Sequence, residues 1–159
     1  MLDCKSQYRN QCIDNYLING HALFPISQNK VPLIKQWNRL QPDLLQPIDL
    51  LHPAYGVILT ATDCVIDFDP RRGQEQLTKL IKLLQLEIPI NTFIVRTMGG
   101  GIHMYFKKSP TLKVPSSHLK QFNAIEIKTH GRFVVGAGST INGKTYKVIR
   151  GSLNALLTL

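Results

Sequence analysis

The stretch Val65-Ile66-Asp67-Phe68-Asp69 places two carboxylates, one residue apart, in a segment whose other side chains favour a β-strand. Side chains alternate between the two faces of a strand, so Asp67 and Asp69 point to one face and Ile66 and Phe68 to the other. Two like charges on a largely apolar strand repel each other and lose hydration, and a cation between them relieves both penalties. The pair therefore predicts half of a divalent-metal site, although a D-x-D pattern also occurs on ordinary solvent-facing sheets.

Two further predicted strands supply the other half of this site. In Ile102–Lys107, His103 lies on the face opposite the apolar residues, and in Ala124–Lys128 the same holds for Glu126 and Lys128. If these strands neighbour the first one, three carboxylates, an imidazole and a lysine share one surface. Such carboxylates suit one or two hard cations, Mg²⁺ or Mn²⁺. A pair of these ions about 3.5–4 Å apart can activate a 3′-hydroxyl and stabilise a leaving pyrophosphate.

A glycine triplet stands between two predicted strands, directly before the strand that carries the histidine. Glycines let the backbone approach a ligand closely, and successive N–H groups can form an anion-binding concavity. The imidazole could donate to a phosphate oxygen, ligate a metal or simply pack as a polar residue, and the glycines also fit a flexible hairpin turn. The candidate nucleotide-binding residues are Gly99, Gly100, Gly101, His103, Lys128, Arg132 and Lys30.

Other residues near these elements carry weaker signals. Arg71 and Arg72 follow the acidic pair after Pro70 and are further basic candidates. Trp37 is either a buried anchor or a platform for base stacking, and its apolar neighbours favour the anchor.

Length and charge limit the class of protein and its partners. The chain has 159 residues, which fits a single domain over 1–159, and a formal net charge of +9. This surplus favours a polyanionic partner, either nucleic acid or a nucleotide, over the alternative of a merely solubilising surface. The three cysteines lack paired spacing, which indicates a reducing, cytoplasmic setting. No apolar run approaches the roughly 20 residues of a membrane span, so no membrane partner is expected.

The hydrophobic pattern predicts an α+β domain with a mainly antiparallel or mixed sheet. The close spacing of 55–60 and 64–69 predicts an antiparallel hairpin, and Asn142-Gly143 predicts a second hairpin. A short helical piece is expected between Pro42 and Pro47, with Pro53 before the next strand, and 153–159 is expected to begin a helix. Helices are predicted over 3–19 and 74–86, and strands over 21–26, 55–60, 64–69, 92–96, 102–107, 124–128, 133–135 and 145–149.

The order of these features resembles the bifunctional DNA primase–polymerase (prim-pol) domain of the archaeo-eukaryotic primase superfamily, over most of the chain. Segments 20–26 and 30–33 with Trp37 are similar to the N-terminal G-x-x-x-x-P…K-x-P-L…W pattern of the family. Its three catalytic motifs are matched by Asp67-Phe68-Asp69, Gly101-Ile102-His103 and Ile125-Glu126-Ile127. The chain departs from the family where Gly99 replaces a common Ser and Glu126 a more usual Asp, and it has no Cys/His cluster like the zinc-binding insert of some members.

The resemblance implies an archaeo-eukaryotic primase-like fold, with an RRM-like catalytic sheet packed against an α/β N-terminal half. It implies template-directed nucleotidyl transfer by a two-metal mechanism, with Mg²⁺ or Mn²⁺ held by Asp67, Asp69 and Glu126. His103 would bind the incoming triphosphate, and Lys128, where the family often has Arg, could help to bind phosphates.

The implied role is DNA primase or DNA polymerase activity in the replication of a plasmid, virus or other mobile element. The expected partners are a single-stranded DNA template, NTPs or dNTPs, and a helicase that is either C-terminal in a longer protein or separate. Two alternatives remain open, a non-catalytic nucleic-acid-binding replication initiator module and a metal-dependent nuclease. The glycine turn before His103 favours the polymerase, because neither alternative requires it.

Overall fold

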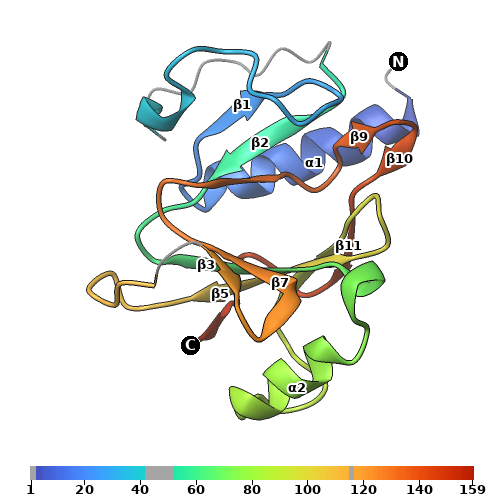
Figure 1. Ribbon diagram of the computed structural model, residues 1–159. Helices are drawn as coiled ribbons and strands as arrows, with labels where there is room; N and C mark the ends of the chain where they lie inside the picture. Colours follow the sequence, from blue (N-terminus) through green and yellow to red (C-terminus); the bar gives the residue numbers. More distant parts are fainter. Residues whose placement is uncertain (1–2, 42–51, 115–116) are drawn as a thin grey trace.

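Two of the three β-sheets in the described residues organise the fold, and the larger one carries the strand of Asp67 near its centre (Figure 1). The computed structural model describes residues 3–41, 52–114 and 117–159. The larger sheet has the order β11-β4-β5-β3-β7-β6, and the short β12 pairs in parallel with β5 while the other pairs are antiparallel. Its strands are β3 (Asp63–Phe68), β4 (Phe93–Arg96), β5 (Ile102–Lys107), β6 (Ser117–Leu119), β7 (Phe122–Lys128), β11 (Lys147–Arg150) and β12 (Leu157–Thr158).

The second layer consists of helix α1 (Cys4–Ile18) and a smaller antiparallel sheet. This sheet has the order β1 (Leu23–Pro25), β2 (Tyr55–Ile58) and β8 (Phe133–Val135). The Asp3 carboxylate caps α1 by accepting from the Ser6 N–H at 2.7 Å, which satisfies one of the free donors of the first turn. Helix α2 (Gln76–Leu83) lies on the opposite side of the larger sheet from α1 (Figure 1).

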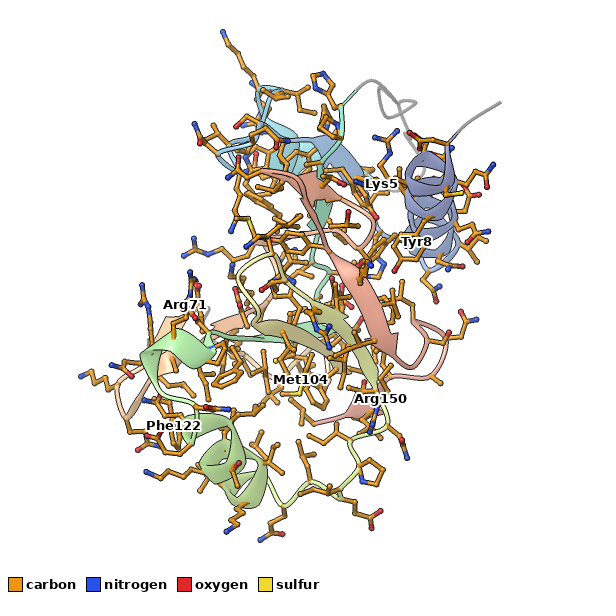
Figure 2. All side chains as sticks on the ribbon, turned by 90° about the vertical axis from the view of Figure 1, so that its right-hand side faces the viewer. Lys5, Tyr8, Arg71, Met104, Phe122 and Arg150 are labelled. Atoms are coloured by element: carbon orange, nitrogen blue, oxygen red, sulfur yellow. The ribbon has the colours of Figure 1, made fainter. Side chains whose placement is uncertain are left out.

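The larger sheet therefore has a hydrophobic core on each face. On the α1 side, Tyr16 packs with Val65 and Tyr105, and the Tyr16 and Tyr105 hydroxyls lie 2.9 Å apart. On the α2 side, Ile66, Met104 and Phe122 pack with Leu80 of α2. Figure 2 shows Met104 and Phe122 on this α2 side of the sheet. A hydrophobic core therefore lies on each face of the sheet, and Asp67 and Glu126 are only partly exposed, at 26% and 32%.

The predicted α+β class and mixed sheet are confirmed, and the Asn142-Gly143 turn does join a hairpin, β9 (Thr140–Ile141) with β10 (Lys144–Thr145). The predicted hairpin of 55–60 with 64–69 is wrong, because β2 and β3 belong to different sheets. Where the chain passes from β2 to β3, Asp63 Oδ2 accepts from the Thr60 N–H at 2.7 Å and lies 3.0 Å from His21 Nε2. These contacts of a buried carboxylate fix the start of β3 apart from β2.

Three smaller expectations had other outcomes. The segment expected to begin a helix at 153–159 instead contributes the strand β12, whose Leu157 pairs with Phe106. A short apolar run such as this one does not by itself distinguish helix from strand. The strand predicted over 145–149 is divided at Tyr146, which separates β10 from β11. The helical piece predicted between Pro42 and Pro47 lies outside the described residues.

Candidate active site

The acidic strand β3 lies between the two strands predicted to accompany it, and their polar residues form one row. Asp67 is paired with His103 of β5 on one side and with Glu126 of β7 on the other. Because directly opposed residues point to the same face, the three side chains stand beside one another across the sheet. The predicted neighbourhood of these strands is thus confirmed, and we refer to Asp67, His103 and Glu126 as the acidic row.

Asp67 is the electrostatic centre of the acidic row. Its Oδ2 lies 3.2 Å from Lys128 Nζ and 3.6 Å from His103 Nε2, and Lys128 Nζ is also 3.7 Å from Glu126 Oε2. Burial by itself would raise the pKa of Asp67, but the contacts with His103 and then Lys128 outweigh it and hold the pKa well below its usual range. Asp67 is therefore a carboxylate at neutral pH, although only 26% of its side chain is exposed.

Asp69 occupies a different environment at the end of β3. It caps the short helix η3 (Pro70–Arg72), accepting from the Arg71 backbone N–H at 3.0 Å. The Arg71 guanidinium binds the same carboxylate at 2.9 and 3.0 Å through Nε and Nη2. The side-chain hydrogen bonds of Arg71 are the main reason that the pKa of Asp69 is lowered. Because the Arg71 side chain is 72% exposed, solvent screens its attraction to Asp69.

The glycine turn is packed tightly against the end of β3. Thr97 donates its N–H to the Gly101 carbonyl at 2.9 Å, and Gly100 takes up the left-handed conformation with φ +80°. A side chain at Gly101 would overlap the Phe68 carbonyl oxygen, and one at Gly99 would stand 3.1 Å from Arg71 Nη2. The turn can therefore hold His103 beside Asp67 only with glycine at position 101.

Two cavities open onto the acidic row, and both are lined by Lys30, Asp67, His103, Glu126 and Tyr146. The first has a volume of about 320 Å³, and we call it the Arg71 cavity. Asp69, Arg71, Arg72, Thr97, Gly99 and Gly101 are among the residues that line it. The second, of about 400 Å³, we call the Trp37 cavity, and Trp37, Lys128, Arg132 and Phe133 are among its lining residues.

These cavities show which predicted site residues come together. The predicted metal ligands Asp67, Asp69 and Glu126 all line the Arg71 cavity. Of the predicted nucleotide-binding residues, Lys128 and Arg132 line only the Trp37 cavity, and Gly100 is exposed and lines neither.

His103 and Tyr146 are the most deeply buried polar side chains at the site. His103 is 4% exposed, and its Nδ1 has no hydrogen-bond partner within the part of the chain that the structure describes. The Tyr146 ring lies 6.0 Å from the His103 ring, and burial, followed by the Asp67 charge, raises the pKa of Tyr146 to about 12. Tyr146 was not among the predicted site residues, since no local sequence pattern distinguishes it from a core tyrosine.

The donor set of the acidic row can be compared with the needs of a divalent ion. Three carboxylates reach one cavity, which is the oxygen-rich chemistry that Mg²⁺ and Mn²⁺ prefer. Among residues 3–41, 52–114 and 117–159, however, no three His, Cys, Asp or Glu side chains are already arranged to hold a metal ion. Lys128 instead pairs with Asp67, and Arg71 with Asp69, so cationic side chains neutralise two of these carboxylates in this structure.

Within the described residues, no helix combines the length and the apolar character needed to cross a membrane.

Comparison with known proteins identifies the family of this chain. No curated protein matches the sequence. The family described as bifunctional DNA primase/polymerase, N-terminal, matches residues 14–157, which include both cavities and the whole acidic row. The chain therefore belongs to the prim-pol family of bifunctional DNA primase/polymerase domains.

Proposed function

We propose that the domain catalyses template-directed nucleotidyl transfer, making or extending primers on single-stranded DNA. The observation that carries this proposal is the acidic row, which opens directly into a cavity bordered by Lys30, Arg71 and Arg72. Carboxylates and cationic side chains around one space suit a metal-bound polyphosphate. Membership of the prim-pol family supports the same class of reaction.

Each carboxylate would have a distinct task in this reaction. Asp67 and Glu126 would hold a divalent ion from neighbouring strands, and Asp69 would join them after release from Arg71. When bound, Mg²⁺ or Mn²⁺ would supply charge stabilisation at the phosphate oxygens and a more acidic 3′-hydroxyl. The low pKa of Asp67 keeps this ligand ionised throughout the physiological pH range.

The remaining side chains would bind and orient the triphosphate. Arg71, once released, would pair with phosphate oxygens through the same fork of donors that now binds Asp69. His103 would contact the phosphates near Asp67, and Lys30 lies where it can reach either cavity. Gly99 and Gly101 would keep the turn close to the phosphates without side chains in the way.

The extent of the catalytic unit is also part of the proposal. We take residues 1–159 as a single catalytic domain, since the two layers share the core around Tyr16. A helicase, in the same protein or separate, would supply unwound template.

Nucleotide incorporation on primed and unprimed single-stranded templates tests this function, with Mg²⁺ or Mn²⁺ and with NTPs and dNTPs in separate reactions. Asp67→Asn should reduce incorporation by about 100-fold or more, because position 67 would no longer supply the carboxylate that holds the charge-stabilising divalent ion. DNA affinity should change by less than about twofold, because phosphate contacts from Lys and Arg dominate it. Asp14→Asn, on the exposed face of α1, is the matched control and should be as active as the wild type.

Three other results would contradict the proposal. Incorporation that survives Asp67→Asn would remove this residue from the reaction. Metal-dependent shortening of the template without incorporation would identify a nuclease. DNA binding without either activity, under every metal and nucleotide condition, would identify a non-catalytic binding module.

A further inference from the structure

Three exposed cationic side chains lie together at the β11 edge of the larger sheet. Lys147 of β11 is directly opposed to Arg96 of β4. Arg150 of β11, after a shift in register, is opposed to Ile94, two residues before Arg96. Figure 2 shows Arg150 at the side of the sheet away from Phe122 of β7. Because opposed residues share a face, we refer to the exposed side chains of Arg96, Lys147 and Arg150 as the basic edge.

The basic edge lies on the face of the sheet opposite the acidic row. Ile94 belongs to the core on the α2 side, and Val95, which is opposed to His103, belongs to the core on the α1 side. Arg96 therefore points to the α2 side and the acidic row to the α1 side. Strands β3 and β11 are separated by β5 and β4, so at a strand spacing of about 4.8 Å they lie about 14 Å apart. The basic edge is thus outside both cavities of the active site.

No carboxylate balances the charge of the basic edge. Within the part of the chain that the structure describes, none of its three side chains takes part in an ion pair. Glu126 is the only acidic residue of the sequence after Glu87. Like charges directly opposed in a sheet repel each other and destabilise the pairing. An anion between Lys147 and Arg96 would remove this repulsion.

Protection of the sheet edge explains only part of this arrangement. Charged side chains on an edge strand deter pairing with another chain, and Lys147 and Arg150 belong to the edge strand β11. Arg96 does not, because β4 lies between β11 and β5. The direct opposition of Arg96 to Lys147 therefore adds repulsion without protecting an edge.

The glycine turn connects the basic edge with the active site. Strand β4 ends at Arg96, and Thr97 and Gly99 of the turn that follows line the Arg71 cavity. A nucleic-acid strand that leaves this cavity across the turn therefore meets Arg96 first and Lys147 next. Its backbone repeats a negative charge at regular intervals, which suits successive cations along one path.

We propose that the basic edge binds the phosphate backbone of the single-stranded template outside the active site. This inference rests on the proposed function, which supplies the template. Contacts to phosphates position a strand and add affinity without reading its sequence. An acidic protein segment is the alternative partner for these charges. The template is favoured because the glycine turn joins the cations directly to the Arg71 cavity.

The salt dependence of binding counts the phosphate contacts directly. Fluorescence anisotropy with a labelled thymidine 20-mer and a chelator gives Kd at roughly 50 to 200 mM salt. Each phosphate contact of a single strand contributes about 0.7 to the slope of log K against log salt. Arg96→Gln combined with Lys147→Gln should therefore lower the slope by about 1.4, which corresponds to about 25-fold in affinity at roughly 0.1 M salt if affinity at 1 M is unchanged.

The matched control removes the same net charge elsewhere. Lys5→Gln combined with Lys79→Gln changes exposed lysines of α1 and α2, and the slope should change by less than about 0.3. Urea unfolding should show the basic-edge variant to be at least as stable as the wild type, because the repulsion between positions 96 and 147 is gone. Absence of binding to the 20-mer, or an equal change of slope in both double variants, would overturn the proposal. Tighter binding to a polyglutamate 20-mer than to the DNA would do the same and would identify a protein partner.

Steady-state incorporation separates this inference from the proposed function. The basic-edge variant should raise KM for a long template and leave KM for the triphosphate, and kcat, unchanged. A change in KM for the triphosphate alone would refute the inference. If the wild type incorporates nothing while the slopes differ as expected, the basic edge is supported and the proposed function fails. If the wild type incorporates nucleotides while the slopes are equal, the function is supported and the basic edge fails.

Discussion

Lys128 supplies the positive charge between two carboxylates of the acidic row, and its removal should make the protein depend more strongly on a divalent ion. Its Nζ lies 3.2 Å from Asp67 Oδ2 and 3.7 Å from Glu126 Oε2, and all three side chains are between 22% and 32% exposed. In Lys128→Met the aliphatic stem is kept while the charge is lost, so packing changes little. The loss of stability in this variant therefore measures how much a positive charge beside the acidic row stabilises the fold.

The size of the effect follows from distance and burial. At 3.2 Å, with an effective dielectric constant of about 20, the attraction between Lys128 and Asp67 is about 5 kcal/mol before desolvation is subtracted. Exposed pairs contribute about 0–1 kcal/mol in net terms, and loss of one partner of a fully buried pair costs about 3–5 kcal/mol. For this half-buried pair we expect the free energy of unfolding at pH 7 to fall by about 1–3 kcal/mol.

Urea unfolding at pH 7, with a chelator and then with saturating Mn²⁺, tests the reasoning. Lys128→Met should be less stable than the wild type in chelator and should gain more stability from Mn²⁺, because the acidic row has then lost the positive charge of Lys128. Lys79→Met, an exposed lysine of α2, is the control and should change the free energy of unfolding by less than about 0.5 kcal/mol. Equal stability of wild type and Lys128→Met in chelator, or a smaller response of the variant to Mn²⁺, would refute the reasoning.

Three further predictions concern pH, the glycine turn and salt. Burial alone would raise the pKa of Asp63, but its hydrogen bond and charge interaction with a buried histidine outweigh this and lower the pKa to about 2. Since the pKa of Asp63 in the folded state lies below its value in the unfolded state, ionised Asp63 stabilises the fold above about pH 4, and this stabilisation is lost as the pH falls toward 2. A free energy of unfolding that does not depend on pH between about 2 and 4 would contradict this prediction. Gly101→Ala should lower the free energy of unfolding by about 1–3 kcal/mol, because the new side chain overlaps the Phe68 carbonyl. Gly99→Ala meets only the mobile end of Arg71 and should change the free energy of unfolding by less than about 0.5 kcal/mol. Urea unfolding measures both variants, and equal losses of stability would contradict this prediction. DNA affinity should fall by about 1000-fold or more between roughly 50 and 200 mM salt if six or more phosphates are contacted, and an affinity flat over that range in fluorescence anisotropy would argue for binding dominated by stacking.

The acidic row could be predicted from the sequence because it depends on strand periodicity alone. Alternation in 64–69, 102–107 and 124–128 gives each strand one polar face, and the structure places these strands side by side. Once strands are neighbours, directly opposed residues must share a face, so Asp67, His103 and Glu126 converge. The catalytic and metal-binding roles of these residues remain predictions, since they depend on ligands rather than on register.

The second layer could not be predicted in the same way, because it depends on contacts distant in sequence. The spacing of 55–60 and 64–69 fits a hairpin locally, but the buried pair of His21 with Asp63, 42 residues apart, fixes β3 in another sheet. The Trp37 cavity likewise joins a loop near residue 30 to the turn before β8, and no local pattern reveals that meeting. Tyr146 enters both cavities from the far end of the chain for the same reason.

The two aspartates of the D-x-D pattern look equivalent in sequence, but the fold gives them unequal freedom. Asp67 lies within β3 and is fixed by neighbours on both sides, so its charge is a constant feature of the site. Asp69 lies just beyond the strand, where its partner Arg71 is 72% exposed and can leave it. A divalent ion that takes Asp69 as a ligand therefore releases a guanidinium beside the cavity in which we place the triphosphate. Metal and phosphate would then each favour the arrival of the other, because the cation removes the carboxylate that competes with phosphate for Arg71.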